Sequence, residues 1–98
     1  MTDYQFHPEA ETEYLETVAY YESQNPGLGA LYISDFESVM KHACGFPARY
    51  PVEKKSDIRR VRLKHFPFTV LFRESDSIIQ VLAVAHHRRR PAYWMNRL

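Results

Sequence analysis

The chain has 98 residues, 45% of them hydrophobic and 14% aromatic, which is enough for one hydrophobic core and too little for two. We therefore expect a single domain over residues 1–98, and the lone cysteine, Cys44, excludes an intramolecular disulfide. The formal net charge of +1 conceals a division, because residues 1–40 hold eight carboxylates and no Lys or Arg, whereas all 13 basic residues and four carboxylates follow. Residues 1–40 carry a formal charge of −8 and residues 41–98 one of +9, which favours an acidic or polyanionic partner for the basic part.

A short strand and a helix are predicted at the N-terminus. Residues 4–7 alternate apolar with polar side chains, and Pro8 ends this strand. A proline followed by glutamates is typical of a helix N-terminus, because the helix dipole favours negative charge there. We expect a helix from Pro8 to the breaker at residues 25–27, with a solvated face holding Glu9, Glu11, Glu13 and Glu16. The buried stripe predicted at helical spacing comprises Ala10, Tyr14, Val18 and Tyr21, with Leu15 and Ala19 beside it.

A second helix is predicted from Leu28 to Gly45. Lys41 and His42 lie in its last turn, where cations are favoured. Its apolar residues recur at steps of three and four, at Leu28, Leu31, Tyr32, Phe36, Val39, Met40 and Ala43. Two amphipathic helices joined by so short a loop predict an antiparallel hairpin, with turn glycines at Gly27 and Gly29.

The remaining sequence predicts a loop and three strands. Residues 46–57 fit neither the helical nor the strand period, whereas residues 58–63, 68–73 and 78–86 alternate as strands do. The short connections between these strands allow only antiparallel neighbours, and the strand at 78–86 is the most apolar. The expected fold class is α+β, with a small antiparallel sheet of the N-terminal strand and a C-terminal three-stranded meander packed against the two-helix hairpin.

Nothing in the sequence predicts a membrane segment. The N-terminus has no basic region leading into an apolar run. The longest strongly apolar stretch, residues 78–85, falls far short of the ~20 residues that a spanning helix needs. We expect a cytoplasmic protein without a membrane partner.

Basic and aromatic side chains gather on the predicted meander. Arg60 and Arg62 share one face of a strand, Arg73 ends the next strand, and residues 86–90 follow the last one as His-His-Arg-Arg-Arg. Neighbouring strands would bring these cations to one groove edged by Tyr93–Trp94, a composition that RNA recognition uses. The alternative interpretation is a solvated edge that protects the sheet from aggregation.

His86 and His87 also allow two interpretations. Imidazole can take and give a proton near neutral pH, as cleavage of a phosphodiester by its own 2′-hydroxyl requires, while arginine would stabilise the transition state. If the strand continues to His87, the two rings point to opposite faces, and one packed and one surface histidine is the other interpretation. The two histidines and Cys44 lack the usual ligand spacing, so we expect no metal and no cofactor.

Several short segments are informative through their order and spacing along the chain. They are Pro8-Glu9-Ala10-Glu11, Tyr20-Tyr21-Glu22, Gly27-Leu28-Gly29, residues 58–63, Phe66-Pro67-Phe68, residues 81–86 and residues 89–94. Over nearly the whole chain they resemble the RelE/ParE superfamily of toxins from bacterial type II toxin-antitoxin systems. The resemblance implies a toxin that a cognate antitoxin neutralises by wrapping it with a C-terminal segment, in a toxin–antitoxin hetero-oligomer. An acidic or amphipathic segment would suit the basic part of the chain.

The resemblance implies one of two targets. ParE-like members inhibit DNA gyrase and are not nucleases, and the helical hairpin with the motifs at residues 20–22 and 91–94 favours this branch. RelE-like members cleave mRNA on the ribosome, and by position their catalytic set would fall on Arg60, Arg62, Arg73, His87, Arg89 and Tyr93. A third possibility is a non-toxic relative that only binds its antitoxin. The apolar tail at residues 93–98 fits either a core or an interface.

Overall fold

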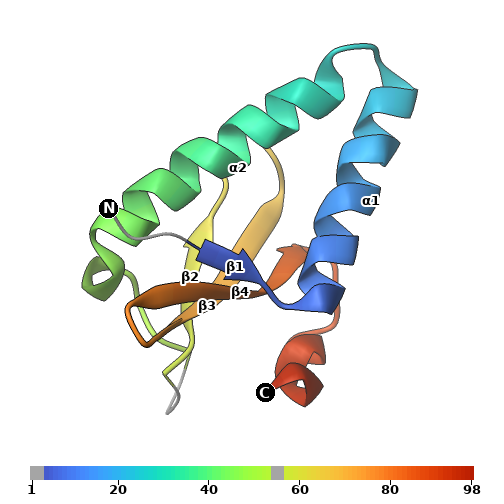
Figure 1. The fold of residues 1–98 in the computed structure, drawn as a ribbon. Coiled ribbons are helices and arrows are strands. Elements are labelled where there is room, and N and C mark those ends of the chain that lie inside the picture. The colour runs from blue at the N-terminus through green and yellow to red at the C-terminus, as the bar shows by residue number, and fades with distance from the viewer. Residues whose placement is uncertain (1–3, 54–56) are drawn as a thin grey trace.

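The structure, a computed structural model, describes residues 4–53 and 57–98, and its two α-helices cover one face of a four-stranded sheet (Figure 1). In chain order the elements are β1 (Tyr4–Phe6), α1 (Pro8–Gln24), α2 (Leu28–Gly45), β2 (Arg59–Arg62), β3 (Phe68–Ser75) and β4 (Ile78–His86). Short 3-10 helices lie at Pro47–Arg49 and Tyr93–Arg97. The predicted α+β class is confirmed, and positions 54–56 of the predicted loop lie outside the described residues.

The strands lie in the order β1-β4-β3-β2. The last three form the predicted antiparallel meander, and a turn at Asp76 and Ser77, both with positive φ, closes the β3–β4 hairpin. β1 pairs with β4 in the parallel direction, with Tyr4 opposite Ile79, so the sheet is mixed. The prediction of an all-antiparallel sheet was wrong for β1, because the long connection from β1 to β4 permits either strand direction.

The hairpin of α1 and α2 follows from local contacts. Pro8 stands in the first turn of α1, and the Nδ1 atom of His7 accepts a hydrogen bond from the Glu9 N–H at 3.1 Å. At the other end, the Glu22 carboxylate accepts the N–H groups of Gly27 and Gly29, also at 3.1 Å. A side chain on Gly29 would place its Cβ 3.0 Å from a backbone carbonyl of α1, so glycine permits the close approach of the helices.

The main core lies between this hairpin and the sheet. Tyr32 and Phe36 of α2 are fully buried there. The predicted helix stripes were too wide, because Leu15 and Leu31 are 57% and 62% exposed and Ala19 is exposed as well. At 100° per residue, positions 15 and 19 lie about 140° and 180° around α1 from its buried alanine at position 10, so they face away from the sheet.

A smaller core occupies the opposite face of the sheet. Ile58, Leu71, Leu82 and Ala83 form it, and Trp94 closes it. We call residues 87–98 the C-terminal tail. Trp94 of this tail is 5% exposed, so the tail serves the core, while other apolar tail residues remain exposed. Within the described ranges, neither α-helix is both long and apolar enough to cross a membrane.

Candidate functional site

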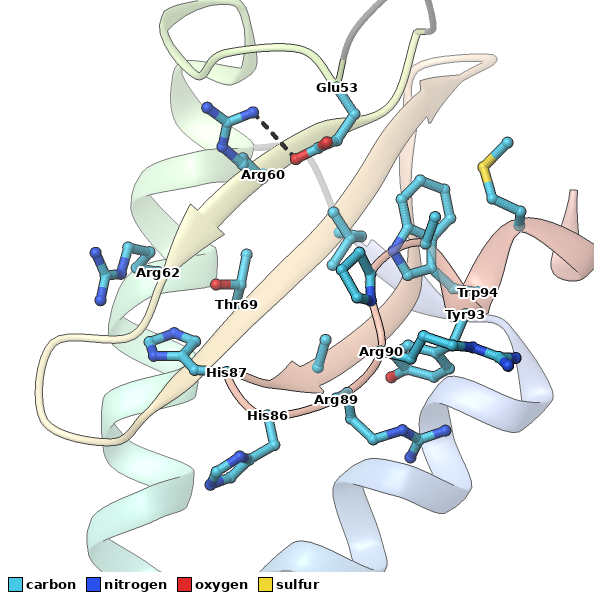
Figure 2. A pocket seen from close by; sticks show the side chains of 15 residues that line it. Glu53, Arg60, Arg62, Thr69, His86, His87, Arg89, Arg90, Tyr93 and Trp94 are labelled. Carbon is cyan, nitrogen blue, oxygen red and sulfur yellow. Dashed lines mark hydrogen bonds and ion pairs between the residues drawn. The ribbon is translucent and has the colours of Figure 1, made fainter.

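A pocket of about 860 Å³ lies on the sheet face opposite the helices (Figure 2). Because side chains alternate along a strand, Thr69 and Leu71 of β3 face this pocket while Val70 and Phe72 face the main core. The lining residues are Glu53, Arg60, Arg62, Thr69, Leu71, Ala85, His86, His87, Arg89, Arg90, Pro91, Ala92, Tyr93, Trp94 and Met95. One side of the pocket is thus the sheet, and the other is the C-terminal tail.

The end of β4 directs the tail over the sheet. β4 ends at His86, whose carbonyl accepts the Arg89 N–H at 2.9 Å and whose Nδ1 accepts the Arg88 N–H at 3.0 Å. The His87 N–H donates to the Pro67 carbonyl at 2.9 Å, which joins this turn to the β2–β3 turn. Both histidines line the pocket, because the strand stops before His87 and the alternation of faces stops with it.

The cations at the pocket differ in their partners. Arg60 pairs with Glu53 at 3.0 Å between Nη1 and Oε1, as the dashed line in Figure 2 marks. Arg62, His87 and Arg90 are exposed, and their side chains make no hydrogen bond or ion pair with another residue in the described part of the chain. Unpaired cations beside an apolar surface attract a ligand that carries negative charge.

Arg73 does not line this pocket. Its Nε donates to Oε1 of Gln80 on β4 at 3.0 Å. Along β3, a register shift between Leu71 and Phe72 separates Arg73 from the pocket-lining residues Thr69 and Leu71. Of the six positions that sequence reasoning assigned to a nuclease, the structure brings together Arg60, Arg62, His87, Arg89 and Tyr93.

Tyr93 is held from several sides. Its hydroxyl donates to Oε2 of Glu13 at 2.8 Å, and the guanidinium carbon of Arg89 lies 3.8 Å from its ring centroid. Burial, followed by the hydrogen bond to Glu13, raises the pKa of the Tyr93 phenol well above its ordinary value of 10. A neutral phenol fixed to a carboxylate, with its ring covered by a guanidinium, is poorly placed to move a proton or to stack on a base.

Glu13 is the residue that sequence reasoning misplaced. It was expected on a solvated face, but its side chain is only 15% exposed and pairs with Arg97, 7% exposed, at 2.7 Å. The position contained a signal, since Glu13 follows the fully buried Ala10 by three residues and therefore shares its face of α1. The hydrogen bond to Glu13 raises the pKa of Arg97, and no sequence pattern pointed to Arg97.

The chemistry of the pocket suits binding. Among the described residues, no three His, Cys, Asp or Glu side chains are grouped as metal ligands would be. Cys44 is buried in the main core, on the other face of the sheet from the two pocket histidines. An apolar surface bordered by unpaired cations matches a ligand that is both apolar and acidic.

Comparisons with known proteins agree with this fold. A family model described as the ParE toxin of the type II toxin-antitoxin system, parDE, matches residues 4–91. Among solved structures, the chain is similar to one described as the chromosomal ParDE TA system from P. aeruginosa, with a TM-score of 0.73 and 17% sequence identity. That similarity covers 88% of this chain and 96% of the other, and at this identity it shows the fold alone. No curated protein matches the chain significantly.

Proposed function

Since the chain belongs to the ParE toxin family of type II toxin-antitoxin systems, we propose that it arrests bacterial growth by inhibiting DNA gyrase and is neutralised by a cognate antitoxin. The family supports the class of protein, and gyrase is the target that likeness to ParE-like members implies. Toxin and antitoxin would form a hetero-oligomer in the cytoplasm. The similar structure described as a ParDE TA system supports an antitoxin as partner.

The contacts of Tyr93 are the observation that favours gyrase over mRNA as the target. If Tyr93 took part in mRNA cleavage at this site, its ring would have to be free to stack on a base or its hydroxyl free to move a proton. In this chain the Tyr93 hydroxyl is bonded to Glu13, and its ring lies under Arg89. This arrangement supports a binding role for the pocket.

The pocket supports an antitoxin segment as its ligand. Leu71, Ala85 and Trp94 supply apolar surface, and the guanidinium groups of Arg62 and Arg90, which have no partner among the described residues, lie at the same pocket. An amphipathic segment with carboxylates could place apolar side chains on the sheet and its charges beside these cations. Because the antitoxin would cover the unpaired cations, neutralisation follows if gyrase needs the same surface.

Induction of the chain without antitoxin in a bacterial host tests the target. Growth, plasmid supercoiling and transcriptome-wide 5′ ends are followed in the same culture, and the purified chain is added to a gyrase supercoiling assay. We expect growth arrest, loss of supercoiling activity and no new codon-phased 5′ ends. Growth arrest with new codon-phased ends would contradict the proposal and assign a nuclease. Absence of arrest would leave an antitoxin-binding relative without toxicity.

The second candidate is a ribosome-dependent mRNA endonuclease. The observation in its favour is that five of the six predicted nuclease residues line one pocket, with only Arg73 elsewhere. Arg89→Gln and Tyr93→Ala separate the two candidates, because removal of the guanidinium or of the whole aromatic ring should abolish transcript cleavage by a nuclease. Toxicity that survives both changes, with thermal melts showing folded variants, would rule this candidate out.

A further inference from the structure

One carboxylate attaches the C-terminal tail to the rest of the molecule. Oε2 of Glu13 accepts hydrogen bonds from the Tyr93 hydroxyl at 2.8 Å and from Nη2 of Arg97 at 2.7 Å. Oε1 accepts from the Val84 N–H at 3.1 Å and from Nη1 of Arg97 at 3.0 Å. These partners are 71 to 84 residues away in sequence, so one side chain of α1 joins β4 and the tail.

The tail depends on such contacts for its position. Its 3-10 helix, Tyr93–Arg97, has five residues, and a helix this short is not stable alone. Arg97 reinforces the attachment by donating to the Leu82 carbonyl of β4 at 2.9 Å. Apart from Trp94, which inserts into the smaller core, the apolar residues Met95 and Leu98 of the tail are 51% and 53% exposed and bury little surface.

We propose that Glu13 is a positioning residue for the pocket: its charge pairs with Arg97 and holds the tail in place as one side of the pocket. Residues 91–95 all line the pocket, so their displacement would remove that side. The sheet and the main core would remain, because they are closed by the helices and not by the tail. The inference rests on the proposed function only where it assigns the pocket to the antitoxin.

Attachment of the tail requires the negative charge of Glu13 and not only the shape of its side chain. Each of its hydrogen-bond partners, Val84, Tyr93 and Arg97, donates to it. A glutamine has nearly the same size, but its amide group would turn two donors of its own toward these donors. It would also leave the buried guanidinium of Arg97 with only the more distant and exposed carboxylate of Glu9, 3.6 Å from its Nε, as a counter-charge, which is unfavourable. Glu13→Gln should therefore release the tail.

The test uses the purified full chain. Trp94 is the only tryptophan, so its emission and its quenching by acrylamide report on the tail. In Glu13→Gln we expect red-shifted emission, stronger quenching, and hydrogen exchange over residues 92–98 faster by about tenfold or more. Exchange in β3 and β4 should be unchanged except at the Val84 amide, which donates to Glu13 itself. Glu16→Gln is the matched control, because Glu16 is exposed on the same helix, and it should behave as the original chain.

Two results would overturn the inference. One is a folded Glu13→Gln variant with unchanged Trp94 emission and unchanged tail exchange. The other is faster exchange in the tail and the sheet together, or loss of the whole fold, which would make Glu13 a determinant of global stability. Arg97→Gln provides a second route, since it removes the cation instead of leaving it unpaired, and it should also speed tail exchange selectively. None of these measurements uses antitoxin or gyrase, so a non-toxic chain would contradict the proposed function alone.

Discussion

The two faces of the sheet are stabilised in different ways. On the helix-facing side, aromatic rings pack in a continuous cluster, with Phe36 at 4.6 Å from Tyr14 and 5.7 Å from Phe6 between ring centroids. On the pocket side, a core of five buried residues is closed by Trp94, and the tail is attached through Glu13 and Arg97. One face is closed by apolar packing, and the other depends on one tryptophan and one charge cluster.

This difference separates stability from recognition. Apolar burial against two helices is non-directional and resists local opening, whereas a short tail held by a few bonds opens at lower free energy. The guanidinium groups of Arg62 and Arg90, which have no partner in the described part of the chain, lie on the less extensively packed face. Substitutions on the helix face should therefore change the free energy of unfolding, and those at the pocket should change binding.

The largest expected effect is that of Phe36→Ala on the helix face. Phe36 is fully buried, so removing its ring leaves a cavity and should lower the free energy of unfolding by about 4 kcal/mol. Urea titration measures this loss as a lower midpoint with an unchanged slope. Leu31→Ala is the control, because Leu31 is 62% exposed and its loss should change stability by no more than about 0.5 kcal/mol. Equal effects of the two changes would contradict the comparison.

Asp35 joins α2 to the β2–β3 turn, and its substitution should have an intermediate effect. Its buried carboxylate on α2 accepts the N–H groups of Lys64 and His65 at 3.1 and 2.8 Å, which fixes the β2–β3 turn. Asp35→Ala leaves these donors without a partner and should cost about 2 kcal/mol in urea titration. Glu37→Ala, an exposed change on the same helix, should cost far less. If Asp35→Ala lowered the free energy of unfolding no more than Glu37→Ala does, the turn would not need the carboxylate.

Regular patterns in the sequence predicted most of the fold. The bounds of α1, α2 and β4 follow from periodicity and from the breakers at Pro8 and at residues 25–27, because these signals are local. The direction of β1 was not predictable, since it depends on a partner 75 residues away, as in Tyr4 and Ile79. Periodicity also overestimated burial at Leu15, because this residue lies about 140° around α1 from Ala10 and therefore faces away from the sheet.

The candidate site was predicted in part. Clustered arginines and the strand register brought Arg60, Arg62 and Arg89 to one pocket, as expected of neighbouring strands. The role of Glu13 was missed, because its partner Arg97 is 84 residues away and the helix-dipole rule already explained a glutamate near a helix start. Contacts between residues so far apart in sequence leave no local pattern.

Tyr93→Phe tests the charge cluster through pH. At neutral pH the change removes one hydrogen bond to Glu13 and should cost about 1 kcal/mol. Because burial raises the pKa of Tyr93 above its unfolded value of 10, this phenol contributes its stability below pH 10 and loses it as the pH rises further. The advantage of the original chain over Tyr93→Phe should therefore shrink above pH 10. Urea titrations at pH 8 and pH 10.5 measure the difference in free energy of unfolding between the two chains. A difference that is the same at both pH values would contradict a raised pKa of Tyr93.

The smallest effect on stability should accompany a clear effect on binding. Arg62 is exposed and unpaired within the described part of the chain, so Arg62→Gln should change the free energy of unfolding by no more than about 0.5 kcal/mol. Calorimetric titration with a cognate antitoxin should show affinity reduced about fivefold, with a weaker dependence on salt.

Arg73→Gln is the matched control for this change, because Arg73 lies on the adjacent strand, bonds to Gln80 and does not line the pocket. Its affinity for the antitoxin should equal that of the original chain. Equal losses from both substitutions would mean that the antitoxin responds to the overall positive charge of the sheet. A loss confined to Arg62→Gln, with both variants as stable as the original chain, would place recognition on the face that contributes least to stability.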